Sequence, residues 1–161
     1  MMAPRDAAAA QSLDALWPYG RLASGAAYAL RLDMARSVAA VGTSLTWQDE
    51  RAGEVRADPE SFGDVVLARK DTPTSYHLAV TVDDALQGVT YVIRGEDLFH
   101  ATHIHVLLQA LLGLPMPVYH HHALIYDESG RRFAKRDRSA TLAACREAGM
   151  TPAEVTAKLG L

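Results

Sequence analysis

The stretch that decides the expected fold is residues 91–137, YVIRGEDLFHATHIHVLLQALLGLPMPVYHHHALIYDESGRRFAKRD. An apolar run ends in the charged turn RGED at 94–97, and a segment with helical spacing follows over 101–112. A second apolar run, 122–126, is predicted to be a strand that leads into a turn ending at Gly130. Strand, charged turn, helix, strand and loop is the order in which α/β domains present a site at the carboxyl ends of their strands.

A cationic loop follows this unit. Arg131, Arg132, Lys135 and Arg136 place four positive charges within six residues, directly after Gly130. Such a density of cations needs either an anionic partner or a solvated surface. The loop is therefore a candidate anion-binding loop, and a solvated basic turn is the alternative.

The totals limit the class of protein. The chain has 161 residues, of which 49% are hydrophobic and 22% charged, as expected for one globular domain. Its net charge of −3 argues against a general coat for nucleic acid, so any contact with a polyanion must be local. The single cysteine excludes an internal disulfide and a multi-cysteine zinc cluster. No apolar run reaches the length of a membrane span and no signal segment is recognised, so we expect a cytoplasmic protein without a membrane partner.

The domain is expected to occupy residues 21–161, after a frayed alanine-rich segment at 1–20. Alternation and short apolar runs predict strands over 26–35, 45–49, 65–68 and 89–93, with a loop over 50–62. The alanine content of the first of these leaves a helix open.

Two further features concern helices. Residues 76–82 are apolar, and Asp83 and Asp84 are placed to begin a short helical turn that Gly88 ends, a structural role that we prefer to a catalytic carboxylate pair. Residues 139–148 are predicted to form a helix with Ser139 as its N-cap. The last helix opens on TPAE at 151–154, with the spacing of a capping box.

The segment DVVLARKDTPTSYHLAVTVDDALQGVTYVIRGEDL at 64–98, followed by HHHALIYDESG and the AKR loop, resembles the glutamyl class I aminoacyl-tRNA synthetases. Within them it is most similar to the short glutamyl-Q tRNA(Asp) synthetases, which lack an anticodon-binding domain. The resemblance covers roughly residues 20–161 and implies the second half of a Rossmann-like catalytic domain, an α/β fold with a parallel sheet and flanking helices.

The resemblance also implies an activity and its residues. Such enzymes activate glutamate with ATP to glutamyl-adenylate, with Mg²⁺ expected, and transfer it to tRNA, here to the queuosine of tRNA(Asp). It places substrate glutamate at Tyr76 and Arg94. It aligns the ATP-binding loop with Arg132, Phe133, Ala134, Lys135 and Arg136, with Lys135 as the catalytic contact. The loop departs from the family pattern at Ala134 and Arg136, where a hydroxyl is lost.

These assignments are chemically reasonable, and each has a plainer alternative. The guanidinium of Arg94 can grip a carboxylate with two parallel hydrogen bonds, or can pair with Glu96 or Asp97. Tyr76 offers a hydroxyl on an apolar body, or is an ordinary core tyrosine. The ammonium of Lys135 can stabilise charge on the departing phosphates, or can belong to the solvated turn.

The histidines at 100, 103, 105 and 120–122 suggest a metal, but we expect none. Successive residues of a strand point to opposite faces, so the triplet does not present three ligands together. No cysteine or acidic cluster completes a tetrahedral set, so zinc is not expected in this chain.

The HIGH-containing half of the class I domain is not recognised in this sequence. We therefore expect an unpaired sheet edge and exposed apolar surface on that side. Three hypotheses follow: a synthetase represented by its carboxyl-terminal half, a non-catalytic half-domain that binds a separate amino-terminal half or self-associates, and a fragment that does not fold alone.

Overall fold

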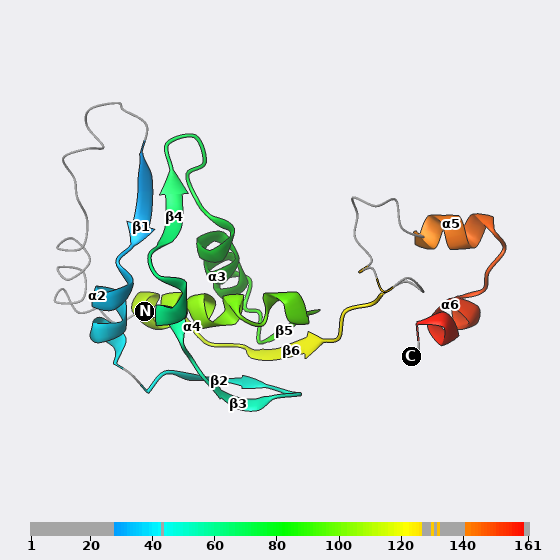
Figure 1. Ribbon diagram of the computed structural model, residues 1–161, viewed down its shortest axis with the longest axis horizontal. Helices are drawn as coiled ribbons and strands as arrows, with labels where there is room; N and C mark the ends of the chain where they lie inside the picture. The colour runs from blue at the N-terminus through cyan, green and yellow to red at the C-terminus, as the bar shows by residue number, and fades with distance from the viewer. Residues whose placement is uncertain (1–27, 43, 127–129, 131, 133–140, 160–161) are drawn as a thin grey trace, which may run out of the picture.

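The computed structural model of the chain describes residues 28–42, 44–126, 130, 132 and 141–159. Its centre is a four-stranded sheet in the order β3-β2-β6-β5, beside a two-stranded antiparallel pair, β1-β4 (Figure 1). The strands are β1 (Ala29–Leu32), β2 (Thr46–Asp49), β3 (Gly53–Arg56), β4 (Val65–Arg69), β5 (Tyr91–Gly95) and β6 (Val118–His122). The helices are α2 (Met34–Val41), α3 (Tyr76–Leu86), α4 (Ala101–Leu112), α5 (Leu142–Glu147) and α6 (Pro152–Lys158), with 3-10 turns η2 (Pro59–Phe62) and η3 (Glu96–Leu98).

The unit β5–α4–β6 confirms the strand, turn, helix and strand predicted from the central stretch. β5 and β6 run parallel in register from Tyr91 opposite Val118 to Gly95 opposite His122. α4 has the predicted bounds and ends at Gly113, whose φ of 63° lies in the left-handed region that favours glycine. The second strand was placed wrongly at 122–126, because β6 ends at His122 and the apolar residues beyond it lie outside the sheet.

α4 is the core of the molecule, and its residues 102–109 are all buried. On the side of the sheet, Val106 packs with Trp47 of β2 and Tyr119 of β6. Elsewhere on the helix Ile104, Leu107 and Leu108 pack with Met34, Val38 and Leu67 of α2 and β4. A helix buried all round needs apolar residues on every face, and ATHIHVLLQALL provides most of them.

The sheet confirms the α/β class and the parallel strands, and it has one antiparallel edge strand that was not predicted. β2, β6 and β5 are parallel, while β3 joins β2 antiparallel as a hairpin. The loop predicted over 50–62 was therefore wrong in part, since it contains β3 and η2. Alternation is weak in GEVR, where three of four residues are exposed, so no periodic signal marked this edge strand.

Two predictions near the start of the described chain need correction. The strand predicted over 26–35 is β1 only as far as Leu32; Asp33 then caps α2 by accepting from the backbone N–H of Arg36. The apolar residues 76–82 and the following aspartates form one helix, α3. Its N-cap is Ser75, whose hydroxyl accepts from the amide of Leu78, so Asp83 and Asp84 lie at its carboxyl end and do not begin a helical turn.

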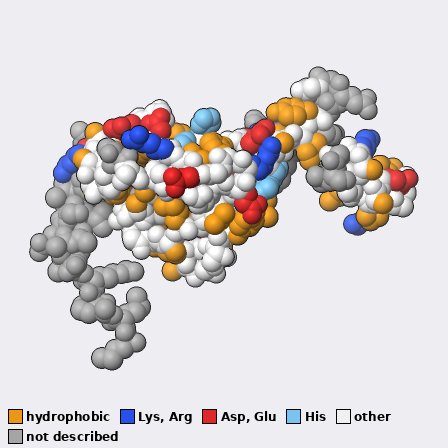
Figure 2. Space-filling view, turned by 90° about the horizontal axis from the view of Figure 1, so that it is seen from below, with side chains coloured by type: hydrophobic (Ala, Val, Ile, Leu, Met, Phe, Trp, Pro, Cys, Tyr) orange, Lys and Arg blue, Asp and Glu red, His pale blue; other side chains and the backbone are white. Residues whose placement is uncertain are grey.

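The carboxyl-terminal helices lie apart from the sheet (Figure 1). The capping box at Thr151 and Glu154 is confirmed, with Pro152 in the first turn of α6. α5 begins after Thr141, while Ser139 and residues 1–20 lie outside the described residues. Within the described part, no helix is long and apolar enough to cross a membrane. Figure 2 looks onto the side of β2 and β3, where the lysine and arginine side chains of the described residues are scattered and form no continuous basic field.

Candidate carboxylate-binding site

Arg94 lies at the carboxyl end of β5, and three neutral side chains hold its guanidinium. Its Nε–H donates to Nε2 of His121 across 3.0 Å, and Nη2 donates to the hydroxyl of Thr102 across 2.6 Å. Nη1 lies 3.1 Å from Nδ1 of His105. These bonds use three of the five N–H donors of a guanidinium. Its plane also lies over the ring of Tyr119, 5.1 Å from the centroid.

No described carboxylate forms an ion pair with Arg94. Burial lowers the pKa of Arg94, and the nearby Tyr119, Tyr76 and Asp84 oppose that change. The group remains charged, because arginine does not lose its proton in proteins. The predicted alternative, a surface pair with Glu96 or Asp97, is not found among the described contacts. A half-buried, unneutralised guanidinium with spare donors is suited to a carboxylate ligand.

The imidazoles around Arg94 are neutral. Burial, together with the positive charge of Arg94, lowers the pKa of His105 to about 3. The same two causes lower the pKa of His77, which meets Nε2 of His105 through its Nδ1 at 3.0 Å. Burial also lowers the pKa of His121, although its hydrogen bond to Asp49 opposes this. Each ring therefore presents a bare nitrogen as an acceptor near neutral pH.

Asp49 supports this network from the end of β2. It is 3% exposed, and its Oδ2 lies 2.7 Å from Nδ1 of His121. Its Oδ1 accepts the backbone amides of Arg51 and Ala52, both at 2.9 Å. Burial raises the pKa of Asp49, but the hydrogen bonds from His121, Ala52 and Arg51 outweigh it, and the pKa lies below its usual value.

The structure brings Tyr76 and Arg94 together. Tyr76 opens α3, its side chain lies close enough to Arg94 to oppose the lowering of the guanidinium pKa, and its ring lies 5.9 Å from that of His105. The residue is 53% exposed, so it is not the core tyrosine of the alternative interpretation. Its hydroxyl therefore stands beside the guanidinium, on the solvent side of a buried network.

The RGED turn contacts Arg132, the one residue of the basic loop that the structure describes. Arg132 donates to Oδ2 of Asp97 across 2.7 Å. Of the predicted ATP-binding residues, the structure describes only Arg132; Phe133, Ala134, Lys135 and Arg136 lie outside the described residues. Arg132 is thus engaged with a carboxylate of the turn.

An open hollow of about 420 Å³ lies at these strand ends. Asp49 and His121 line it from β2 and β6, and Glu96 and Phe99 line it from the segment after β5. Carboxyl ends of parallel strands are where α/β sheets bind ligands.

Sequence reasoning missed the residues that support Arg94, namely Asp49, His77, Thr102, His105 and His121. One signal was present: strand alternation in the triplet sends His121 to the buried face, away from His120 and His122. No group of three metal-ligating side chains is found among the residues that the structure describes.

The fold is that of an α/β domain with its candidate site at the carboxyl ends of parallel strands. Residues 20–161 match the family of class I tRNA synthetases (E and Q), catalytic domain, and the chain belongs to that family.

Individual relatives agree with this placement. The glutamyl-Q tRNA(Asp) synthetase of Rhodobacter capsulatus is 52% identical over 136 residues, which cover 83% of this chain and 49% of the relative. That of Nocardia farcinica is 43% identical over 139 residues, covering 86% and 42%. The crystal structure of a glutamate tRNA ligase from Elizabethkingia meningosepticum in complex with its amino acid matches with a TM-score of 0.58 and 26% identity, covering 80% of this chain and 24% of that one. The chain therefore spans about half, or less, of the length of these proteins.

Proposed function

We propose that this chain is the part of a glutamyl-Q tRNA(Asp) synthetase that holds glutamate during its activation by ATP. The reacting carboxylate oxygen attacks the α-phosphorus and pyrophosphate leaves; the glutamyl group then passes from the adenylate to the queuosine of tRNA(Asp), with AMP as the leaving group. We place this reaction in the cytoplasm, with its tRNA substrate. The observation that carries the proposal is Arg94: a charged guanidinium at a strand end, held by neutral groups, with the Tyr76 hydroxyl beside it.

Arg94 and Tyr76 have distinct roles in this proposal. Glutamate has two carboxylates, and Arg94 holds the one that does not react through the N–H donors left by its three internal bonds. Tyr76 orients the same end of the substrate. Since positioning of reactants accounts for much of the rate of such reactions, both residues act on affinity and on rate.

Lys135 is proposed to contact the departing phosphates, and Mg²⁺ is expected to accompany ATP. Arg132 forms an ion pair with Asp97, which lies three residues beyond Arg94 in the RGED turn. Lys135 follows Arg132 by three residues, and three residues of extended chain span about 11 Å at most. The developing negative charge of pyrophosphate is the group that an ammonium would stabilise there.

A second candidate function is a half-domain that binds a separate amino-terminal half or a second copy of the chain. Among the described residues, β5 is an edge strand that pairs only with β6. On the sheet face opposite α4, Ile93 is 66% exposed, and Tyr91 and Val118 are each 39% exposed. Parallel sheets are normally covered on both faces, so these residues mark a surface that another segment would bury.

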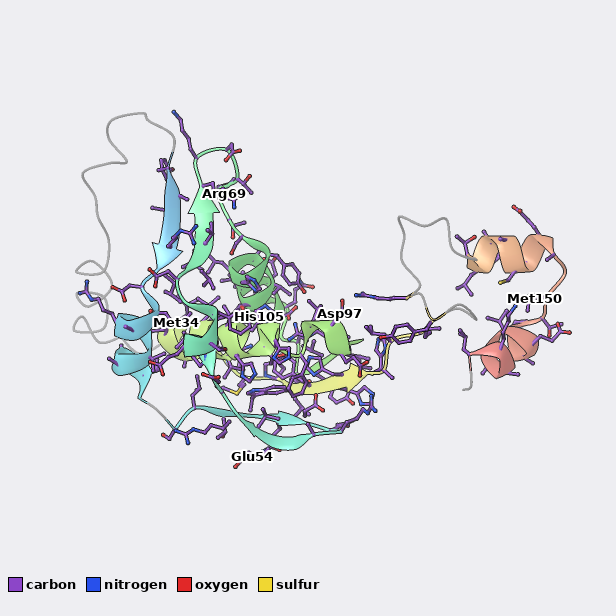
Figure 3. The ribbon with its side chains drawn as sticks, viewed as in Figure 1. Met34, Glu54, Arg69, Asp97, His105 and Met150 are labelled. Atoms are coloured by element: carbon purple, nitrogen blue, oxygen red, sulfur yellow. The ribbon has the colours of Figure 1, made fainter. Side chains whose placement is uncertain are left out.

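The test is glutamate-dependent ATP–pyrophosphate exchange by the chain. We expect Arg94→Ala and Lys135→Ala to abolish it and Arg69→Ala, at the distant end of β4 (Figure 3), to leave it unchanged. Exchange that survives Arg94→Ala would overturn the glutamate assignment. A folded chain without exchange, which gains it when mixed with the amino-terminal half of a relative, would favour the half-domain.

A further inference from the structure

We propose that Asp49 and His121 are positioning residues for Arg94: the Asp49 carboxylate fixes the proton of His121 on Nδ1, so that bare Nε2 accepts from Arg94 and holds the guanidinium ready for a carboxylate. The inference rests on the proposed function for its ligand, glutamate. Its internal part, from Asp49 to Arg94, stands on the geometry of this chain alone.

The first step is the proton on Nδ1. Both oxygens of Asp49 are occupied by donors, since Oδ1 accepts two backbone amides and Oδ2 faces the amide of His121 at 3.3 Å and its Nδ1 at 2.7 Å. An ionised carboxylate can only accept, so Nδ1 must carry the hydrogen. The residue is 3% exposed, which leaves little room for water to replace this contact.

The second step is the other ring nitrogen. Nε2 of His121 lies 3.0 Å from Nε of Arg94 and 3.2 Å from the hydroxyl of Thr102. Arginine has no acceptor, so a hydrogen on Nε2 would face the Arg94 N–H directly. Only the tautomer that Asp49 selects can join the two residues. The carboxylate thus acts on Arg94 through an imidazole, as outer-shell carboxylates act on ligand histidines elsewhere.

A parallel branch holds the opposite side of the guanidinium. Nδ1 of His105 faces Nη1 of Arg94 at 3.1 Å, so it must be bare, and its Nε2–H then donates to Nδ1 of His77. This branch ends on an imidazole that is neither fully buried nor held by a carboxylate among the described contacts. Of the two branches, the Asp49 branch is therefore the one that ends on a buried carboxylate. Removing that carboxylate should leave the Arg94 side chain less restrained.

The decisive substitution is Asp49→Asn, which keeps the shape. An asparagine has one acceptor oxygen where aspartate has two. In a first arrangement this oxygen accepts from the amides of Arg51 and Ala52, and the NH₂ faces His121; in a second, the oxygen faces His121, and the NH₂ faces the two amides. In the first arrangement it drives the His121 proton to Nε2. The matched control is Glu50→Gln, because Glu50 makes the same carboxylate–imidazole contact, 2.9 Å, to His120 on the exposed face of β6.

Three measurements on the folded chain test the proposal: the His121 tautomer by long-range ¹H–¹⁵N NMR, the rate of solvent exchange of the Arg94 Nε–H, and the affinity for L-glutamate by calorimetry. We expect Asp49→Asn to move the His121 proton to Nε2, to speed Arg94 Nε–H exchange, and to weaken glutamate binding by about tenfold or more, as for a lost hydrogen bond to a charged group. Glu50→Gln should change none of these.

The outcomes separate the two proposals. A His121 proton already on Nε2 in the unaltered chain, or Arg94 exchange that Asp49→Asn leaves unchanged, overturns the positioning role. If tautomer and exchange respond as expected but the unaltered chain binds no glutamate, the proposed function fails and the positioning of Arg94 stands. If Asp49→Asn does not fold, His121→Gln and His121→Leu decide: the amide oxygen of glutamine should preserve the slow Arg94 exchange that leucine loses, and equal exchange in the two variants overturns the inference.

Discussion

Arg94 of β5 and Thr102 of α4 are joined by a 2.6 Å hydrogen bond, which ties the strand to the helix that follows it. Thr102 is 0% exposed, and its hydroxyl also lies 3.3 Å from the carbonyl of Leu98 and 3.2 Å from Nε2 of His121. One buried hydroxyl thus links the guanidinium, the 3-10 turn η3 and the imidazole of β6. The candidate site is therefore built into the crossover unit and does not lie on a loop.

Thr102→Val keeps the shape of this side chain and removes its acceptor. We expect it to lower the free energy of unfolding by about 2 kcal/mol, because a buried N–H of a charged group loses its partner. Thr102→Ser keeps the hydroxyl, so it should cost less. Urea unfolding of the three chains measures the difference, and an equal loss for valine and serine would mean that the hydroxyl contributes little.

The neutral His105 makes stability depend on pH. In the unfolded chain its pKa has the ordinary value of 6.5, while in the folded chain it is about 3. Between pH 7 and pH 5 the unfolded form therefore gains a proton that the folded form does not, and the chain loses stability by about 2 kcal/mol from this residue. The lowered pKa values of His77 and His121 act in the same direction.

Thermal unfolding between pH 7 and pH 5 checks the sign of this pH dependence and whether His105 causes it. His105→Gln retains an acceptor for Arg94 but does not titrate, so its stability should fall less steeply from pH 7 to pH 5 than that of the unaltered chain. An unchanged slope would assign the pH dependence to other groups. The lowered pKa of Asp49 acts in a separate window: its contribution is present above 3.8, its ordinary value, and is lost as the pH falls further.

The parts of the fold that sequence predicted are those with a local signal. α4 has continuous helical spacing and a closing glycine, and the capping box of α6 spans four residues. α3 was missed in part because the β-branched residues Val80, Thr81 and Val82 weaken the helical pattern and the aspartates after them resemble a start. Ser75, immediately before Tyr76, was the signal that would have found its true beginning.

The residues of the candidate site divide in the same way, into those with a local sequence signal and those without one. Tyr76 and Arg94 were predicted from motifs, and the structure places them side by side. The contact between Asp49 and His121 joins residues 72 positions apart, so no local pattern predicts it. The separation of His121 from its histidine neighbours followed from strand alternation, but its carboxylate partner depends on the pairing of β2 with β6.

Gly95 permits the close approach on which the RGED turn depends. A Cβ at this position would lie 2.6 Å from Oδ1 of Asp97 and 3.0 Å from Cδ2 of Leu124. In Gly95→Ala we expect the Asp97 side chain to move and its ion pair with Arg132 to break. Because that pair is partly exposed, stability should change by only about 1 kcal/mol, whereas the KM for ATP in the exchange reaction should rise.

Asp97→Ala is the matched comparison, since it removes the ion pair without crowding the backbone. If both variants raise the KM for ATP alike, the ion pair with Arg132 is the cause. A higher KM in Gly95→Ala alone would point to displacement of the turn and of Arg94 with it.

Ile93 on β5 tests the open face of the sheet. It is 66% exposed, and the side chains next to it in the strand, Val92 and Arg94, point to the opposite face, toward α4. Ile93→Lys should therefore leave the unfolding free energy of the isolated chain nearly unchanged, and should weaken association with a second copy or an amino-terminal half, because a lysine there would have to be buried. Ile125→Lys, at a residue 40% exposed outside the sheet, is the control. Sedimentation of each variant, alone and mixed with the amino-terminal half of a relative, measures the association. If Ile93→Lys leaves the association intact, the interface does not lie on this face.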